Sequence, residues 1–292
     1  MVNILITGAN SYIGTSLEKW LKKDSDKYYV DTLDMKDNEW KNRDFSKYDV
    51  VFHVAGIAHV STDPKMEQLY YKINRDLTIE TAKKAKFDGA CQFIFMSSII
   101  VYGDSSSINH KRVISRNTVP HPTNFYGNSK LQAEEGIMLL DDDKFKVVVL
   151  RPPMIYGKGS KGNYPKLAKM AQKLPFFPDV DNERSMLHID NLCEFIRLVI
   201  QNEEKGIFFP QNKEYVNTAM MVKLIAEAHG KKIKITKAFN PALRVMGNFV
   251  GMVNKAFGNL VYEKSMSEYK DEYRIGDLRE SIRITEVESR EI

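Results

Sequence analysis

The first 21 residues constrain the fold of this chain more than any other part of the sequence. Residues 2–7 are largely apolar, which is typical of a strand buried on both faces of a sheet. Glycine stands at both ends of the turn at 8–14, and residues 15–21 continue with a helical spacing of apolar side chains. Glycine lets such a turn tighten and approach a pyrophosphate at the helix N-terminus. The order of strand, glycine turn and helix predicts a dinucleotide-binding unit; a similar turn without a nucleotide is the alternative.

An acidic residue, Asp34, ends the second predicted strand at residues 28–33. It follows the glycine turn by about 20 residues, where an acidic side chain commonly binds the adenosine ribose of a dinucleotide. A carboxylate at this place repels the 2′-phosphate of NADP, so Asp34 favours NAD. Lys36 stands two residues further on and leaves NADP open.

Composition argues against several other classes of protein. The 292 residues are enough to bury a large core, as one domain or as one domain with a lobe. The formal charge of +5 comes from interspersed residues, and short lysine pairs indicate solvated faces rather than a nucleic-acid surface. Cys91 and Cys193 stand among apolar residues, which favours buried thiols over a disulfide or a metal site. We see no signal peptide and no run of about 18 apolar residues, so we expect a cytoplasmic protein without a transmembrane segment.

Strands and helices alternate along the first half of the chain. Strands are predicted at 49–54, 91–96 and 146–150, and helices at 66–86 and 126–140. This alternation predicts an α/β fold with a doubly wound parallel sheet of the Rossmann type. Ligands bind at the carboxyl ends of such strands. One crevice beside the glycine turn is therefore expected to be lined by Ala55–Gly56, Ser97–Ser98 and Pro152–Pro153.

A phenol and an ammonium, Tyr126 and Lys130, stand four residues apart at the start of a predicted helix, so they share one helix face. A positive charge beside the phenol favours the phenolate and lowers the tyrosine pKa, which would make Tyr126 a proton donor and acceptor near neutral pH. Such pairs are also common on helix surfaces. Ser98 follows a buried strand, and its hydroxyl could bridge a substrate oxygen and the phenol, or only satisfy the backbone there.

Together these motifs resemble the extended short-chain dehydrogenase/reductases, which include nucleotide-sugar epimerases, dehydratases and 4-ketoreductases. The motifs run in the order typical of that family, from about residue 4 to about residue 200. They are Thr7–Gly14, Phe52–Gly56, Ser97–Gly103, Tyr126–Lys130, Arg151–Gly157 and Arg184–Asp190.

The resemblance implies roles for individual residues. Ser98, Tyr126 and Lys130 would be the catalytic residues, and Lys130 would also hold the nicotinamide ribose. Asn74 stands where the family has a structural asparagine. The expected cofactor contacts are Gly8, Ser11, Tyr12, Ile13 and Gly14 at the pyrophosphate, Asp34 at the ribose, Asp44 and Phe45 at the adenine, and Val54, Ala55, Gly56, Asn74, Ser97, Tyr126, Lys130 and Pro153 elsewhere. The expected substrate contacts are Ser98, Tyr102, Asn163 and Arg184, the last of them at the diphosphate of a nucleotide sugar.

Departures from the family pattern bear on the reaction. Ser11 replaces the middle glycine of the turn, and Met154 stands where UDP-galactose 4-epimerases usually have an asparagine. The Arg-Pro-Gly-Asp segment of those epimerases is also absent. These points favour an NAD(P)-dependent 4-ketoreductase that acts on a nucleotide-linked sugar, such as a UDP-4-keto-6-deoxy-HexNAc used for surface polysaccharides. A UDP-sugar 4-epimerase with tightly bound NAD is the alternative, and a catalytically idle NAD(P)-binding sensor is the third hypothesis.

The remaining expectations concern domains and partners. Residues 1–155 and 190–205 are expected to form the NAD(P)-binding domain, and residues 156–189 and 206–292 a substrate-binding lobe with a polar tail from 262 onwards. Residues 239–261 are rich in Met, Phe, Val and Gly, which favours core packing, with a helix bound to a membrane surface as the alternative. The family habit implies a homodimer built on helices around residues 74–86 and 126–140.

Overall fold

The computed structural model describes residues 1–57, 63–106, 108, 110–246, 254 and 256–287. Within it the chain divides into two compact units. Unit 1 comprises Met1–Gly103, Val119–Pro153 and Leu192–Pro210, and unit 2 comprises Asp104–Thr118, Met154–Asn191 and Gln211–Ile292. The segment Asp104–Thr118 thus groups with unit 2, whereas the division expected from the sequence left it in the first domain.

Unit 1 is built on a six-stranded sheet in which every neighbouring pair of strands is parallel. The strands, in spatial order, are β10 (Gly206–Phe208), β6 (Lys146–Leu150), β4 (Gln92–Met96), β3 (Val50–His53), β1 (Val2–Thr7) and β2 (Tyr28–Leu33). The chain passes from β1 to β2 on one side and then to β3 on the other. The strand order therefore reverses between β1 and β3, which is where doubly wound folds bind their ligands. The predicted fold class is confirmed.

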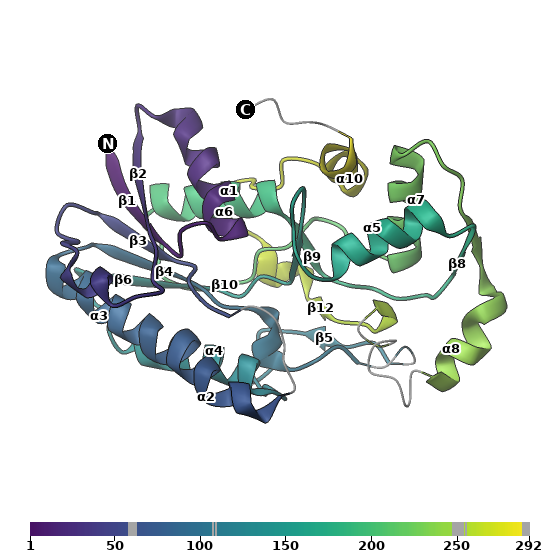
Figure 1. Ribbon diagram of the computed structural model, residues 1–292, viewed down its shortest axis with the longest axis horizontal. Helices are drawn as coiled ribbons and strands as arrows, with labels where there is room; N and C mark the ends of the chain where they lie inside the picture. The colour runs from purple at the N-terminus through teal and green to yellow at the C-terminus, as the bar shows by residue number, and fades with distance from the viewer. Residues whose placement is uncertain (58–62, 107, 109, 247–253, 255, 288–292) are drawn as a thin grey trace. The chain divides into compact units, whose positions relative to one another are not determined.

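Helices cover both faces of this sheet, with α3 and α4 on one face and α1 and α6 on the other (Figure 1). Their bounds are Tyr12–Leu21 for α1, Leu77–Asp88 for α3, Phe125–Met138 for α4 and Ile189–Gln201 for α6. Side chains alternate along a strand, so Leu5, Val51 and Phe93 point to one face and pack in a core with Ala82 of α3 and Ala133 of α4. Their neighbours Ile4, Phe52 and Ile94 are also buried, which explains why the strands read as continuous apolar runs.

The long helix predicted at 66–86 is interrupted. A 3₁₀ turn (Pro64–Met66) and α2 (Glu67–Tyr70) lead into a π-helical segment, Tyr71–Asp76, and only then does α3 begin. Gly89, with a φ of 101°, ends α3 in the left-handed conformation. Wide π-helical turns often occur at functional sites. Asn74 lies inside this one and is fully buried.

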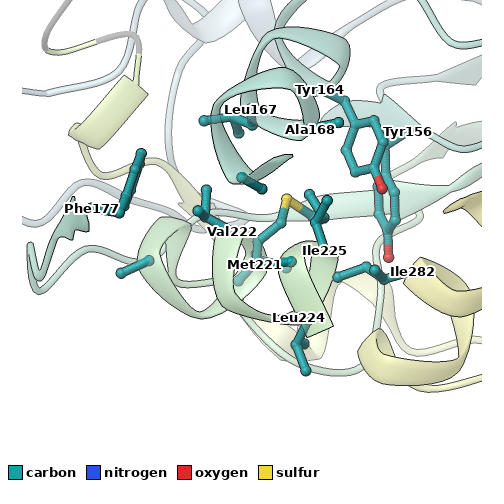
Figure 2. Close-up of a cluster of buried hydrophobic side chains, with 14 of the residues drawn as sticks. Tyr156, Tyr164, Leu167, Ala168, Phe177, Met221, Val222, Leu224, Ile225 and Ile282 are labelled. Atoms are coloured by element: carbon teal, nitrogen blue, oxygen red, sulfur yellow. The ribbon is translucent and has the colours of Figure 1, made fainter. Parts of the chain in front are cut away.

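Unit 2 combines two-stranded parallel pairs with helices. The pairs are β7 (Met154–Tyr156) with β9 (Met186–His188), β8 (Phe176–Pro178) with β11 (Lys234–Thr236), and β5 (Val113–Ile114) with β12 (Val261–Tyr262). The helices are α5 (Asn163–Lys173), α7 (Thr218–Ala228), α8 (Asn240–Met246) and α10 (Leu278–Glu286). Figure 2 shows the core between α5 and α7, where Tyr164 and Leu167 face Val222 and Ile225, with Ile282 of α10 beside them.

Three further expectations are met only in part or not at all. The polar tail expected from 262 onwards is wrong for its described part, because Tyr273 is fully buried and α10 packs on the core through Ile282. Cys193 is buried as expected, but Cys91 is exposed. In the segment 239–261, residues 247–253 and 255 lie outside the described residues; Phe257 and Val261 are buried, whereas Phe239 is 48% exposed. Among the helices that the described residues form, none is long and apolar enough to cross a membrane.

Candidate active site

Helix α4 holds Tyr126 and Lys130 on one buried face. Asn124 caps the helix, since its Oδ1 accepts a hydrogen bond from the Gly127 amide at 2.9 Å. Tyr126 is 8% exposed and Lys130 is 5% exposed, so the pair does not belong to an ordinary solvated helix surface. The Tyr126 ring lies 6.0 Å from the ring of Tyr70, centroid to centroid. The burial of two polar side chains together indicates a role beyond solubility.

Ser98 reaches the same place from the carboxyl end of β4. It caps the 3₁₀ turn Ile99–Tyr102 by accepting a hydrogen bond from the Ile100 amide at 3.3 Å. The Ile99 amide in turn donates to the Pro152 carbonyl at 2.9 Å, which ties the end of β4 to the segment that follows β6. Burial raises the pKa of the Tyr126 phenol, and the Ser98 hydroxyl lies close enough to the phenol to oppose this rise by hydrogen bonding. The structure thus brings together all three predicted catalytic residues.

The pKa of Tyr126 differs from the expectation. Burial raises the pKa of the phenol to about 12, and the hydrogen bond from Ser98 only partly opposes this shift. The predicted lowering by Lys130 is not seen in this geometry. The reason is that the Lys130 ammonium donates to the Met96 carbonyl at 2.8 Å and lies over the Phe95 ring, 4.5 Å from its centroid. Desolvation dominates over charge at this phenol.

Lys130 itself has a strongly shifted pKa. Burial lowers it from 10.5 to about 7, although the carboxylate of Glu134, one helical turn further along α4, opposes the shift. Lys130 therefore changes its charge near neutral pH. A lysine in this state can donate hydrogen bonds and respond to a charge placed beside it.

Asn74 joins the end of β3 to α4. Its Oδ1 accepts a hydrogen bond from the Ile57 amide at 2.8 Å, and its Nδ2 donates to Ser129 Oγ at 3.2 Å. The Ser129 hydroxyl then donates to the Tyr126 carbonyl at 2.8 Å. Gly56 permits this approach, because a Cβ there would lie 2.9 Å from Asn74 Oδ1 and 3.3 Å from Lys130 Nζ. The polar atoms of Asn74 thus position the helix that carries Tyr126 and Lys130.

The glycine turn lies at the switch point of the sheet. Gly8 has a φ of 101°, and a Cβ there would meet the Ala55 amide nitrogen at 2.7 Å, so only glycine fits against the end of β3. Asn10 takes the other left-handed position with a φ of 64°. Ser11 is extended, with a φ of −73°, and caps α1 by accepting from the Gly14 amide at 3.1 Å. Serine is therefore compatible with the position where the family has its middle glycine.

Except for Asp44 and Phe45, the remaining predicted cofactor residues of unit 1 lie near the carboxyl ends of β1–β4 or beyond β6. Asp34 is exposed just after β2, and its Oδ2 lies 3.5 Å from Lys36 Nζ. Asp44 is exposed and accepts hydrogen bonds from Ser46, which lower its pKa. Phe45 is fully buried in the core, and its amide donates to Asp88 Oδ2 at 3.0 Å. Because Asp88 ends α3 just before β4, Asp44 and Phe45 lie toward the amino ends of the strands, away from the edge where the adenine was expected. Tyr12 and Ile13 begin α1, Val54 and Ala55 follow β3, Ser97 follows β4, and Pro153 is buried beyond β6.

A buried polar network that was not predicted from the sequence includes Ser97, the residue that precedes Ser98. Arg151 donates from Nε to Glu134 Oε2 at 3.0 Å and from Nη1 to the Tyr102 hydroxyl at 2.7 Å. The Ser97 hydroxyl donates to Glu134 Oε1. Glu134 is 2% exposed and Tyr102 is 3% exposed, so the predicted substrate residue Tyr102 is held inside the unit. The spacing of Tyr126, Lys130 and Glu134, four residues apart each time, was the available signal for this carboxylate.

The last two predicted substrate residues belong to unit 2. Asn163 is exposed at the first position of α5. Arg184 is half-buried; its amide donates to the Val216 carbonyl at 3.0 Å, and its carbonyl accepts from the Val216 amide at 2.8 Å. Burial lowers the pKa of the Arg184 guanidinium.

The glycine turn at the switch point of a parallel sheet defines unit 1 as a Rossmann domain of the dinucleotide-binding class. Residues 4–209 match the NAD dependent epimerase/dehydratase family, and the chain belongs to this family. Membership confirms the predicted family and the expectation of an enzyme that uses a nicotinamide cofactor, NAD or NADP.

Two curated relatives cover most of the chain. It is 32% identical over 252 residues to a UDP-glucose 4-epimerase of Vibrio cholerae, across 78% of this chain and 76% of the relative. It is 27% identical over 254 residues to an N-acetyl-alpha-D-glucosaminyl-diphospho-ditrans,octacis-undecaprenol 4-epimerase of Escherichia coli O157:H7, across 79% of this chain and 73% of the relative.

A solved structure supports the fold along nearly the whole chain. A dTDP-4-dehydrorhamnose reductase from Clostridium acetobutylicum superposes with a TM-score of 0.73, covering 97% of this chain and 98% of that one. The two sequences are 20% identical, so this likeness concerns the fold alone.

Proposed function

We propose that this protein transfers a hydride at C4 of a sugar that is linked to a diphosphate, with a nicotinamide cofactor. The observation that carries the proposal is the convergence of Ser98, Tyr126 and Lys130, all in unit 1, at the carboxyl edge of the parallel sheet. The two curated relatives described above are both named as 4-epimerases, which supports chemistry at C4.

The three side chains have distinct roles in this proposal. Tyr126 exchanges a proton with the C4 oxygen, since its phenol is buried and hydrogen-bonded to Ser98. Ser98 donates a hydrogen bond to the same oxygen and fixes its position. The pKa of Lys130 is about 7, so its side chain takes up or releases a proton near neutral pH. In the protonated form it balances the charge of the phenolate. The nicotinamide, when bound, supplies or accepts the hydride.

The glycine turn fits a dinucleotide. Gly8 leaves space where any other residue would place a Cβ against Ala55, and the N-terminus of α1 offers backbone amides to a pyrophosphate. Asp34, exposed after β2, would bind the adenosine ribose and favour NAD. In unit 2, Arg184 would hold the diphosphate of the substrate, because a guanidinium matches phosphate geometry, and Asn163 would contact the nucleotide or the sugar.

The net reaction has two candidates, each favoured by its own observation. Epimerisation comes first, because relatives with 32% and 27% identity over most of the chain are named as 4-epimerases. The sugar would then be oxidised to a 4-ketone, turn over in the site and regain the hydride on its other face. Reduction of a 4-keto-sugar nucleotide is the second candidate, favoured by Met154 at the place where UDP-galactose 4-epimerases usually have asparagine.

Incubation with UDP-glucose, UDP-GlcNAc and a UDP-4-keto-6-deoxy-HexNAc, each with NAD, NADH or NADPH, tests this proposal. Conversion of UDP-glucose to UDP-galactose, or of UDP-GlcNAc to UDP-GalNAc, without added reductant supports epimerisation, and consumption of NADH or NADPH with the third supports reduction. Cofactor binding without turnover on any sugar would instead support the idle sensor.

Replacement of the phenol tests the assignment of Tyr126. Tyr126→Phe removes the exchangeable proton, so turnover should fall by about 100-fold or more while NADH affinity stays close to that of the wild type. Tyr70→Phe makes the same change in the neighbouring buried ring and serves as the matched control. Full activity of Tyr126→Phe would show that the assignment is wrong.

Location and assembly follow the family expectation. We propose a cytoplasmic homodimer whose interface uses helices around residues 74–86 and 126–140. Light scattering during size-exclusion chromatography of the full chain tests the dimer, which is contradicted by a monomeric mass.

A further inference from the structure

Two segments of unit 2 are free of acidic residues. The chain contains 38 Asp and Glu residues, yet none occurs between Met154 and Pro178 or between Ala228 and Tyr262. Both segments are rich in lysine. They pair through the parallel strands β8 and β11, in which Phe176 lies opposite Lys234 and Pro178 opposite Thr236. Folding therefore concentrates positive charge that is interspersed with acids elsewhere in the chain.

Large apolar side chains are exposed in the same place. Phe177 is 2% exposed and lies in the core of unit 2 (Figure 2), so the alternation along β8 turns Phe176 outward, where it is 49% exposed. Leu174, just after α5, is 42% exposed and Phe239 is 48% exposed. We define the basic–apolar patch as the exposed residues Lys173, Leu174, Phe176, Lys234, Lys237 and Phe239.

Backbone contacts hold the parts of the patch together. The Asp179 amide donates to the Thr236 carbonyl at 2.9 Å, which extends the pairing of β8 with β11. The Asn240 side chain donates from Nδ2 to the Asp179 carbonyl at 2.7 Å, and this bond fixes the 3₁₀ turn Lys237–Phe239 beside β8. Asp179 and Asp181 are the acidic residues that come closest in sequence, and both follow the end of β8.

We propose that the basic–apolar patch docks this protein on the surface of an anionic phospholipid bilayer. Lysines near such a surface are attracted to anionic headgroups, and exposed apolar side chains enter the boundary between headgroups and acyl chains. Charge complementarity selects an anionic partner. Leu174 favours a bilayer over a nucleic acid, because an aliphatic side chain gains from hydrocarbon and not from stacking on bases, whereas the two phenylalanines suit either partner. The proposal is independent of the reaction at C4.

Sedimentation of the full-length protein with vesicles tests this proposal. The wild type should bind vesicles of phosphatidylcholine mixed with phosphatidylglycerol, bind phosphatidylcholine vesicles weakly, and lose most of its binding at high NaCl. Lys173→Glu, Lys234→Glu and Lys237→Glu combined should lower the partition coefficient by about 100-fold or more. Phe176→Ser with Phe239→Ser should lower it by about tenfold.

Matched variants of unit 1 control for net charge and for exposed aromatic area. Lys19→Glu, Lys27→Glu and Lys144→Glu combined carry the same charge change, and Phe87→Ser removes a ring that is 91% exposed. Both should bind vesicles much as the wild type does, and all variants should keep the melting temperature and the activity on a soluble substrate.

Several outcomes would overturn the proposal. Equal binding to charged and uncharged vesicles would do so, as would no vesicle binding at low salt. Equal losses in the patch and control variants would show a general charge effect, and binding of single-stranded DNA but not of vesicles would identify a nucleic-acid surface instead. If a variant fails to fold, the dependence of wild-type vesicle binding on lipid charge and on NaCl still tests the proposal.

Discussion

Glu134 and Arg151 form an ion pair that is buried inside unit 1, with Nε of the arginine 3.0 Å from Oε2 of the glutamate. The pair joins α4, which carries Tyr126 and Lys130, to the end of β6. Through Ser97, which donates to the same carboxylate, the pair also reaches the residue that precedes Ser98. The ion pair thus sets the distance between the helix and the strand end that supply the catalytic side chains.

Replacement of Glu134 by glutamine should lower both stability and turnover. Breaking a buried ion pair leaves an uncompensated charge on Arg151, which costs about 3 kcal/mol. The loosened Ser97 lets Ser98 move, and turnover should fall about 10- to 100-fold. Thermal unfolding and steady-state kinetics measure the two effects. Glu194→Gln breaks the more exposed pair with Arg197 and should cost less than about 1 kcal/mol without affecting turnover. Equal turnover in both variants would contradict the positioning role.

Lys130 should make stability depend on pH above neutrality. Its pKa is about 7 in the folded chain against an ordinary value of 10.5, so between these values the unfolded chain binds the proton more tightly. The free energy of unfolding therefore rises with pH in this window, by up to about 1.4 kcal/mol per pH unit. Denaturant titrations at several pH values should show this rise in the wild type and a flatter profile in Lys130→Met. If the free energy of unfolding changed with pH by the same amount in the wild type and in Lys130→Met, the lowered pKa of Lys130 would be contradicted.

Gly56→Ala should impair the site more than the fold. Its Cβ would meet Asn74 Oδ1 at 2.9 Å and Lys130 Nζ at 3.3 Å, so one or both side chains must move. We expect a loss of stability of about 1–3 kcal/mol and a fall in turnover of about 10-fold or more. A double-mutant cycle with Asn74→Ala isolates the collision, because the two substitutions should then be less than additive. Strict additivity would exclude this contact as the cause.

Asp34→Ala should shift the cofactor preference toward NADP. The carboxylate is exposed beyond β2, so its removal should change the free energy of unfolding by less than about 0.5 kcal/mol. The ratio of kcat/KM for NADH to that for NADPH should fall about tenfold or more, because the ribose loses a hydrogen bond and a 2′-phosphate loses a repulsive charge. Lys36→Ala, which removes the lysine beside this carboxylate, should leave the ratio equal or higher. An unchanged ratio in Asp34→Ala would place the ribose elsewhere.

The sheet and the residues at its edge could be predicted from the sequence, since buried parallel strands read as apolar runs and their polar ends follow at once. Gly8 and Ser98 were found in this way, and Tyr126 was found from its four-residue spacing to Lys130 on one helix face. The turn at residues 8–14 was predicted as well, but the sequence did not reveal that Ser11 caps α1 or that Asn10 takes the left-handed conformation.

What could not be predicted depends on contacts between distant segments. Glu134 and Arg151 are 17 residues apart, and only the packing of α4 on the sheet makes them partners. The raised pKa of Tyr126 reflects burial beside Tyr70, which a count of nearby charges does not include. Tyr273 was assigned to a polar tail because its neighbours are charged, yet its hydroxyl bonds the Gln211 carbonyl inside unit 2.

The π-helical segment Tyr71–Asp76 makes chain length itself a requirement of the site. A π turn holds one residue more than an α turn. Here the extra residue belongs to the segment that turns the Asn74 side chain toward Ile57 and Ser129. Removal of a single residue, such as Lys72, would let the helix close into regular α geometry at little cost to its own hydrogen bonds. The same removal would change the direction in which the side chains of this segment point, Asn74 included. A shortened chain could therefore keep its helix and lose the link between β3 and α4, a fault that no substitution scan of this segment would reveal.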